Sequence, residues 1–201
     1  MGLRETKKER TRNELASTAM SLFVRRGFDH VTVAEVAAAA GVSEKTVFNY
    51  FPTKEDLFFD EVPEREAALL EAVRSRAPGE TVTASLHRLQ AGECTRLSSP
   101  QFAIFARVID ESPALRAKEI EVMARLTDSL ATVIAEELGV AEVEAKIAAN
   151  MLIGVHWELF RSARTQALAG RAGAGAVRRL RADLDRAYAL LEHGLGSLEA
   201  G

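Results

Sequence analysis

The sequence of 201 residues lacks the features that hold a protein together outside the cell or anchor it in a membrane. It has one cysteine, Cys94, so no internal disulfide can form, and a free thiol fits a reducing cytoplasm. No apolar run approaches the ~20 residues of a membrane-spanning helix. The N-terminus also lacks the apolar core of a signal peptide. These absences predict a soluble, cytoplasmic protein.

The sequence also lacks the groupings on which most metal and catalytic sites depend. The four histidines are scattered, with no metal-binding spacing to each other or to the cysteine. His87 and Cys94 would lie about 10.5 Å apart along a helix, which is too far for a nucleophile and its base. The glycine-rich run from Gly170 to Gly175 has neither the preceding strand nor the Lys-Ser/Thr ending of a phosphate-binding loop. We predict no metal, no cofactor and no enzymatic activity; an enzyme of unrecognised type is the remote alternative.

The charge is divided unevenly along the chain. The net charge is −3, which argues against a protein that coats nucleic acid along its whole surface. Residues 1–54 nevertheless hold nine Lys and Arg against six Asp and Glu, whereas the remainder holds 17 against 23. Such a division is typical of a DNA-binding domain joined to a domain that does not bind DNA.

Residues 31–57, VTVAEVAAAAGVSEKTVFNYFPTKEDL, predict two short helices joined by a tight turn, followed by the start of a third. Thr32 and Glu35 have the spacing of a capping box at the start of the first helix. Gly41 ends that helix, because glycine adopts the left-handed conformation at the lowest cost. Ser43 caps the second helix, and a proline follows its last turn. This order is typical of a helix-turn-helix motif.

The second helix of this motif is polar or aromatic on every side except the one that carries Val47 and Phe51. In helix-turn-helix proteins the helix at this place reads base edges in the major groove. The residues alone leave one alternative, an ordinary αα-hairpin with a solvated face.

The remainder of the chain predicts further helices. A helix runs from Lys54 to about Arg76 with a break at Pro63, and turn signals separate the helices that follow. No strand-like alternation occurs anywhere in the sequence. We therefore predict an all-α fold of about nine helices.

Residues 15–57 resemble the N-terminal DNA-binding domain of the TetR (tetracycline repressor) family of bacterial transcription regulators. The matching segments are LASTAMSLFVRRGF, VTVAEVAAAAGVS and KTVFNYFPTKEDLF, in the order and spacing of the family. The resemblance implies an all-helical homodimer. It places a three-helix DNA-binding domain at residues 1–54 and a ligand-binding and dimerisation domain at residues 55–201.

The resemblance also implies roles for individual residues at the DNA. It assigns base-edge contacts to Glu44, Lys45 and Asn49, and phosphate contacts to Thr32, Ser43, Thr46, Tyr50 and Lys54. Lysine can donate to guanine and asparagine can pair with adenine, while hydroxyl and ammonium groups bind phosphate oxygens. At Phe48 the family usually has tyrosine. Since phenylalanine has no hydroxyl, we expect van der Waals contact with a thymine methyl group or a sugar.

The last predicted helix starts near Ala176 and carries an apolar stripe at heptad spacing. The stripe consists of Val177, Leu180, Leu184, Ala187 and Leu191. In TetR-like proteins the last two helices build the dimer interface, so the resemblance places the contact with the partner on this stripe. The alternative is that the stripe packs on the chain's own core.

A ligand pocket in an all-helical domain is expected to be mostly apolar with a few polar groups. The residues that fit this description are Phe102, Phe105, Arg107, Met123, Asn150, His156, Trp157 and Phe160. For each of them the alternative is an ordinary place in the core.

The resulting interpretation is a homodimeric DNA-binding transcription regulator. We expect a repressor that a small, largely apolar ligand releases from a palindromic operator in double-stranded DNA. The alternative from another class is a helix-turn-helix DNA-binding protein without small-molecule control.

Overall fold

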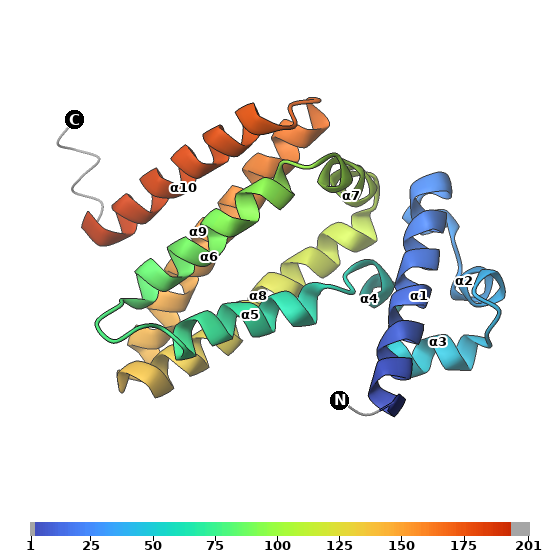
Figure 1. The fold of residues 1–201 in the computed structure, drawn as a ribbon, viewed down its shortest axis with the longest axis horizontal. Coiled ribbons are helices and arrows are strands. Elements are labelled where there is room, and N and C mark those ends of the chain that lie inside the picture. Colours follow the sequence, from blue (N-terminus) through green and yellow to red (C-terminus); the bar gives the residue numbers. More distant parts are fainter. Residues whose placement is uncertain (1–2, 194–201) are drawn as a thin grey trace. The chain divides into compact units, whose positions relative to one another are not determined.

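The computed structural model describes the backbone of residues 3–193 and the side chains of residues 7–192, and the regular secondary structure of this part of the chain is all helical (Figure 1). The elements in chain order are α1 (Leu3–Arg26), the 3-10 helix η1 (Phe28–His30), α2 (Val33–Ala39), α3 (Glu44–Tyr50), α4 (Lys54–Phe58), α5 (Val62–Arg74), α6 (Val82–Leu97), α7 (Pro100–Glu111), α8 (Pro113–Leu138), α9 (Glu142–Leu168) and α10 (Ala174–His193). The all-α prediction is confirmed. The number of α-helices described is ten, where about nine were predicted.

The chain forms two compact units. The first unit consists of Met1–Pro63 and Arg107–Glu119, and the second of Glu64–Ala106 and Ile120–Gly201. Helices α7 and α8 therefore contribute residues to both units. The division into functional domains at residues 1–54 and 55–201 stays a prediction.

The helix predicted from Lys54 to Arg76 breaks earlier than expected. Helix α4 ends at Phe58, and α5 begins at Val62, one residue before Pro63. A proline in the first turn of a helix removes no helical hydrogen bond, because the first amides have no partner there. Pro63 thus lies inside the start of α5, and the break falls on residues 59–61.

The first unit is built around a cluster of aromatic rings. The ring centroid of Phe23 lies 4.8 Å from that of Phe28 and 6.3 Å from that of Phe58, and all three side chains are buried. The segment where α7 meets α8 is tied to this unit by a hydrogen bond of 2.8 Å from the Ser112 hydroxyl to Asp29. The short helices α2 and α3 are therefore supported by a core much larger than either of them.

The core of the second unit is formed by buried residues of all six of its helices, from α5 to α10. Helices α6 and α10 lie side by side (Figure 1), and the Gly173 amide donates to the Ser98 carbonyl where α6 ends and α10 begins. Further along the same two helices, His87 and Asp185 form a hydrogen bond of 2.8 Å. The two helices are therefore antiparallel.

The apolar stripe on α10 lies largely against this core. Leu180 and Leu184 are fully buried within the chain, Val177 and Leu191 pack partly buried against the same cluster, and Ala187 is half-buried. This packing corresponds to the alternative in which the stripe covers the chain's own core. Contact of these residues with a partner stays a prediction.

Gln90 is a polar residue in the middle of the second core. Its side chain is 2% exposed, and neither its amide oxygen nor its amide nitrogen has a hydrogen-bond partner among the described residues. The buried hydroxyl of Tyr188 is likewise unpaired, and burial raises the pKa of this phenol. An unpaired polar group in an apolar interior costs free energy, because it has lost its hydrogen bonds to water.

Gln90→Leu is expected to raise the free energy of unfolding by about 1–3 kcal/mol, since it removes an unpaired amide at similar volume. Ser85→Ala is the matched control on the same helix, because the buried Ser85 hydroxyl does donate, to the Val82 carbonyl at 2.9 Å. This control is expected to gain nothing. Urea unfolding measures both variants, and a Gln90→Leu protein less stable than the parent would contradict the prediction.

Candidate nucleic-acid interface

Helix α2 begins with the predicted capping box. The Thr32 amide donates to a Glu35 carboxylate oxygen at 2.8 Å, and the Glu35 amide donates to the Thr32 hydroxyl at 3.2 Å. Arg26 forms an ion pair with the other Glu35 oxygen at 2.8 Å. The hydrogen bond from the Thr32 backbone, and then that from Arg26, hold the pKa of Glu35 below its ordinary value. The prediction of this helix start is confirmed.

The turn between α2 and α3 is fixed by its backbone. Gly41 has a φ of 69°, in the left-handed region that favours glycine. The Val42 amide reaches back to the Ala37 carbonyl at 3.0 Å, and the Gly41 amide reaches the Ala38 carbonyl at 3.2 Å. These two bonds form a Schellman motif. Helix α3 then starts directly after Ser43, as the sequence predicted.

Helix α3 has one buried and one exposed face. Val47 is fully buried, and Phe51 directly after the helix is buried as well. The exposed residues of α3 and its cap are Ser43, Glu44, Lys45, Phe48 and Asn49, while Thr46 and Tyr50 are half-buried. The Phe48 side chain is 46% exposed. The base-edge candidates therefore lie together on one accessible surface.

Three of the predicted phosphate-binding hydroxyls already have partners. The Thr32 hydroxyl lies 3.1 Å from a Glu35 carboxylate oxygen, and the hydroxyls of Ser43 and Thr46 lie 2.9 Å apart. In the Ser43–Thr46 pair only one hydroxyl donates, so one proton stays available to an acceptor outside the chain. Their assignment to phosphate is untested by this geometry.

The Lys54 ammonium group acts inside the first unit. It donates to the carbonyls of Phe28 and Val31, both at 3.1 Å, and lies 4.1 Å from the centre of the Phe28 ring. These contacts connect the start of α4 to the segment between α1 and α2. They use two of the three N–H groups of the ammonium. The sequence showed a lysine at a helix start but no sign of these carbonyl partners.

The predicted ligand residues are only partly brought together. The rings of Phe102, Phe105 and Phe160 contact one another, with centroids 5.3–6.5 Å apart. Met123 packs partly buried against the same core. Asn150, by contrast, is exposed, with its amide bonded to the Lys146 carbonyl.

The other three candidates differ in their surroundings. Trp157 and His156 are half-buried, and burial lowers the pKa of His156 to about 4, with nearby Glu93 opposing the shift only in part. His156 is therefore neutral at pH 7. Arg107 is exposed and belongs to the first compact unit, whereas the other seven candidates belong to the second. A shared role for the eight residues stays a prediction.

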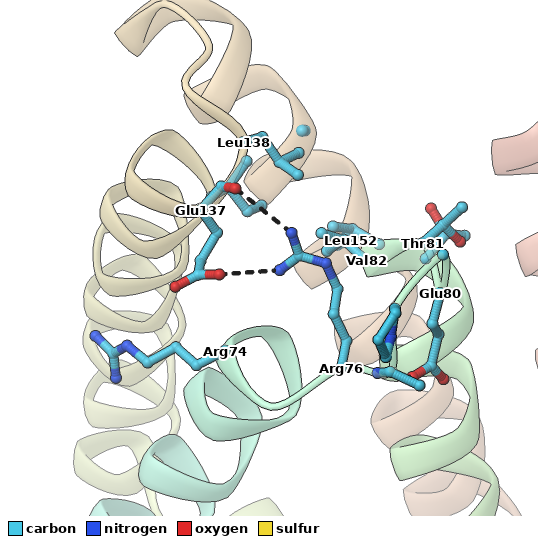
Figure 2. Close-up of a pocket in the computed structure, with 14 residues that line it drawn as sticks. Arg74, Arg76, Glu80, Thr81, Val82, Glu137, Leu138 and Leu152 are labelled. Carbon is cyan, nitrogen blue, oxygen red and sulfur yellow. Dashed lines mark hydrogen bonds and ion pairs between the residues drawn. The ribbon is translucent and has the colours of Figure 1, made fainter.

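The second unit contains a cavity of about 660 Å³ that none of these eight residues lines (Figure 2). Arg76, Val82, Glu137, Leu138 and Leu152 are among the residues around it. Sequence reasoning missed it, because its lining comes from the segment between α5 and α6 together with residues of four helices, rather than from one periodic pattern.

The described part of the chain lacks two further features. No three His, Cys, Asp or Glu side chains with described positions lie close enough together to hold a metal ion. No helix within residues 3–193 is long and apolar enough to cross a membrane.

The chain is all helical and has a helix-turn-helix motif with an exposed, polar second helix. These features place it in the class of helix-turn-helix proteins. Residues 15–60 match the sequence model described as "Bacterial regulatory proteins, tetR family". The HTH-type transcriptional regulator TcmR of Streptomyces glaucescens is 30% identical over 147 residues, which cover 69% of this chain and 65% of TcmR. LuxR of Vibrio harveyi, also an HTH-type transcriptional regulator, is 49% identical over 51 residues, 25% of this chain and 24% of LuxR. The matches thus span less than two thirds of these curated relatives.

Solved structures resemble the chain over nearly its whole length. FadR of Thermus thermophilus, a TetR-family transcriptional repressor in complex with lauroyl-CoA, has a TM-score of 0.54 and 26% identity over 92% of this chain and 94% of FadR. Native NalD of Pseudomonas aeruginosa has a TM-score of 0.60 and 19% identity over 89% and 97%. The chain belongs to the TetR family.

The hydrogen bonds from Lys54 to the carbonyls of Phe28 and Val31, here called the Lys54 clamp, are expected to stabilise the first unit. Lys54→Met is expected to lower the free energy of unfolding by about 1–3 kcal/mol, because two carbonyls lose a charged donor while the aliphatic stem is kept. Lys45→Met is the control, since Lys45 is exposed on α3. Equal unfolding free energies of the two variants in denaturant titrations would show that the clamp contributes nothing.

Proposed function

We propose that this chain is a homodimeric repressor, not an enzyme, that binds a palindromic operator through α3 and is released by a small, largely apolar ligand. The observation that carries this proposal is the two-sided character of α3. Its buried side, Val47, fixes it in the first unit, while Glu44, Lys45, Phe48 and Asn49 face outward. An exposed surface of this kind on a recognition helix suits the major groove. Such a protein acts in the cytoplasm, where the DNA is.

The exposed side chains divide by the base atoms that each can contact. Lys45 donates to guanine O6 and N7, Asn49 pairs with adenine N6 and N7, and Glu44 accepts from cytosine N4. Phe48 meets a thymine methyl group or a sugar, and its exposure in the free protein leaves apolar surface that DNA would cover.

The residues around this surface hold the phosphates. Tyr50 and one hydroxyl of the Ser43–Thr46 pair can donate to phosphate oxygens, and Lys54 has one N–H group left for the same purpose. Thr32 contributes by fixing the start of α2 through its capping box. Contacts of this kind set the register of the protein on the duplex but carry no sequence information.

Dimerisation is supported by an apolar face of α9 that the chain itself leaves uncovered. Val143, Ile147 and Met151 follow one another at four-residue spacing and are all about half exposed or more. Residues at this spacing share one helix face. We assign the contact with the partner chain to this face, together with the half-buried α10 residues Val177, Ala187 and Leu191.

Ligand control is supported by the relatives of known structure. The Thermus FadR repressor was crystallised with an acyl-CoA, and its fold extends over most of this chain. A ligand reduces DNA affinity only if it binds the conformation that does not bind DNA more tightly. A hundredfold reduction needs about 2.7 kcal/mol of coupling, which is within the usual range.

The base-reading proposal is tested on DNA selected by the parent protein from random duplexes. Lys45→Ala and Asn49→Ala are each expected to lose discrimination at one position per half-site, with a cost of about 1–3 kcal/mol there. Affinity for unrelated DNA should change much less. A uniform loss of affinity for all sequences would assign the residue to the phosphates instead.

The interface proposal is tested by a pair of matched substitutions. Ile147→Asp is expected to give a monomer in sedimentation experiments, because it places a charge in the proposed interface. Ile120→Asp is the control, since Ile120 on α8 is 64% exposed and Ile147 is 56% exposed. A folded Ile147→Asp protein that remains dimeric would place the interface elsewhere.

A further inference from the structure

The cavity of the second unit has a charged side and an apolar side. It lies where α5 ends, α6 begins and α8 ends, with the Ala148 and Leu152 side chains of α9 completing it. Its volume of about 660 Å³ lies in the range of small-molecule sites. The apolar lining consists of Ala77, Pro78, Val82, Ile134, Leu138, Ala148 and Leu152.

Arg76 is the polar group at the centre of this arrangement. One terminal nitrogen, Nη1, donates to the Val73 carbonyl at 2.6 Å and approaches a Glu137 carboxylate oxygen at 3.3 Å. The other, Nη2, approaches the Glu137 carbonyl at 3.5 Å, a distance at the limit of a hydrogen bond. The Arg76 Nε–H and the second Nη2 proton have no acceptor in the described part of the chain.

The unused edge of Arg76 faces the cavity. Figure 2 shows Glu137 on one side of the guanidinium, and Val82 and Leu152 on the other. The Nε and Nη2 protons of a guanidinium form a planar fork that matches the two oxygens of a carboxylate. An acceptor placed in the cavity can therefore meet two donors at once.

The remaining charges at the cavity favour a single negative charge on the ligand. Glu80 is compensated by Arg88 at 3.0 Å and by the Ala77 amide, and Glu137 by Arg76. Arg74 also lines the cavity and forms no ion pair among the described side chains. Among the lining residues two arginines balance two glutamates, but both glutamates are already paired, so the positive groups left to a ligand are Arg74 and the unused edge of Arg76.

We propose that this cavity is a binding site for an amphipathic monocarboxylate, whose carboxylate pairs with the free edge of Arg76 and whose apolar body lies against Val82, Leu138 and Leu152. A neutral apolar ligand would leave the guanidinium edge buried and unpaired. A cationic ligand would lie beside Arg74 and Arg76, and both carboxylates at the cavity are already paired. That such a ligand also controls DNA binding rests on the function proposed above.

Calorimetric titration of the full chain with decanoate, in the absence of DNA, tests the site, with 1-decanol as the uncharged probe of equal length. Saturable binding of decanoate is expected, at least about tenfold tighter than that of 1-decanol, because only the carboxylate uses the charged fork. Arg76→Gln is expected to remove this preference. Equal affinity for the two probes, or no saturable binding of decanoate, would overturn the proposal.

A second variant keeps the test independent of any structural role of Arg76. Leu138→Asp introduces a negative charge at the rim of the cavity and should weaken decanoate binding several-fold. Leu168→Asp is its control, since Leu138 and Leu168 are both nearly half exposed and are the last residues of α8 and α9. Equal effects of the two substitutions would mean that decanoate binds elsewhere.

DNA release is measured separately, by titrating decanoate into the complex with selected DNA. If decanoate binds more tightly than 1-decanol but does not release the DNA, the binding site is supported. Control of DNA binding through this site is then contradicted. Failure of the chain to bind DNA contradicts the proposed function, and the calorimetric comparison then still decides whether the site exists.

Discussion

The burial of Val47 and Phe51 is the contact on which the DNA-facing surface depends. A helix of seven residues is not stable by itself in water, so α3 keeps its shape and direction only because one of its sides is packed in a core. Phe51 is covered in turn by the guanidinium of Arg12, 4.6 Å from its ring centre. The outward position of Lys45 and Asn49 follows from this packing. When one face of a helix is packed in the core, side chains on the opposite face point to solvent.

Several contacts in the first unit hold the motif as one piece. The Schellman motif after α2 sets the angle at which α3 begins, and Lys54 joins the start of α4 to the carbonyls of Phe28 and Val31. In the second unit, α10 packs on the core, whereas one apolar face of α9 is exposed. The surfaces that we propose for reading DNA and for dimerisation therefore belong to different parts of the chain.

The sequence was sufficient to predict the structural features that depend on residues close together in the chain. The caps at Thr32 and Ser43 and the turn at Gly41 follow from side-chain chemistry within a few residues, and the structure has them as predicted. Periodicity identified the α10 stripe, but it cannot say what the stripe meets, and Leu184 packs inside the chain. The partners of Arg76 lie on two helices, and only the folded chain brings Glu137, 61 residues away, to its guanidinium.

Symmetric reading of DNA by two copies of α3 is the main proposal for this protein. It is tested most directly by selecting duplexes from a random pool with the unmodified chain and sequencing those that are retained. The expected result is a near-palindrome whose half-sites lie in successive major grooves, about 34–36 Å apart. Retention without sequence preference, or enrichment of a single asymmetric half-site, would contradict it.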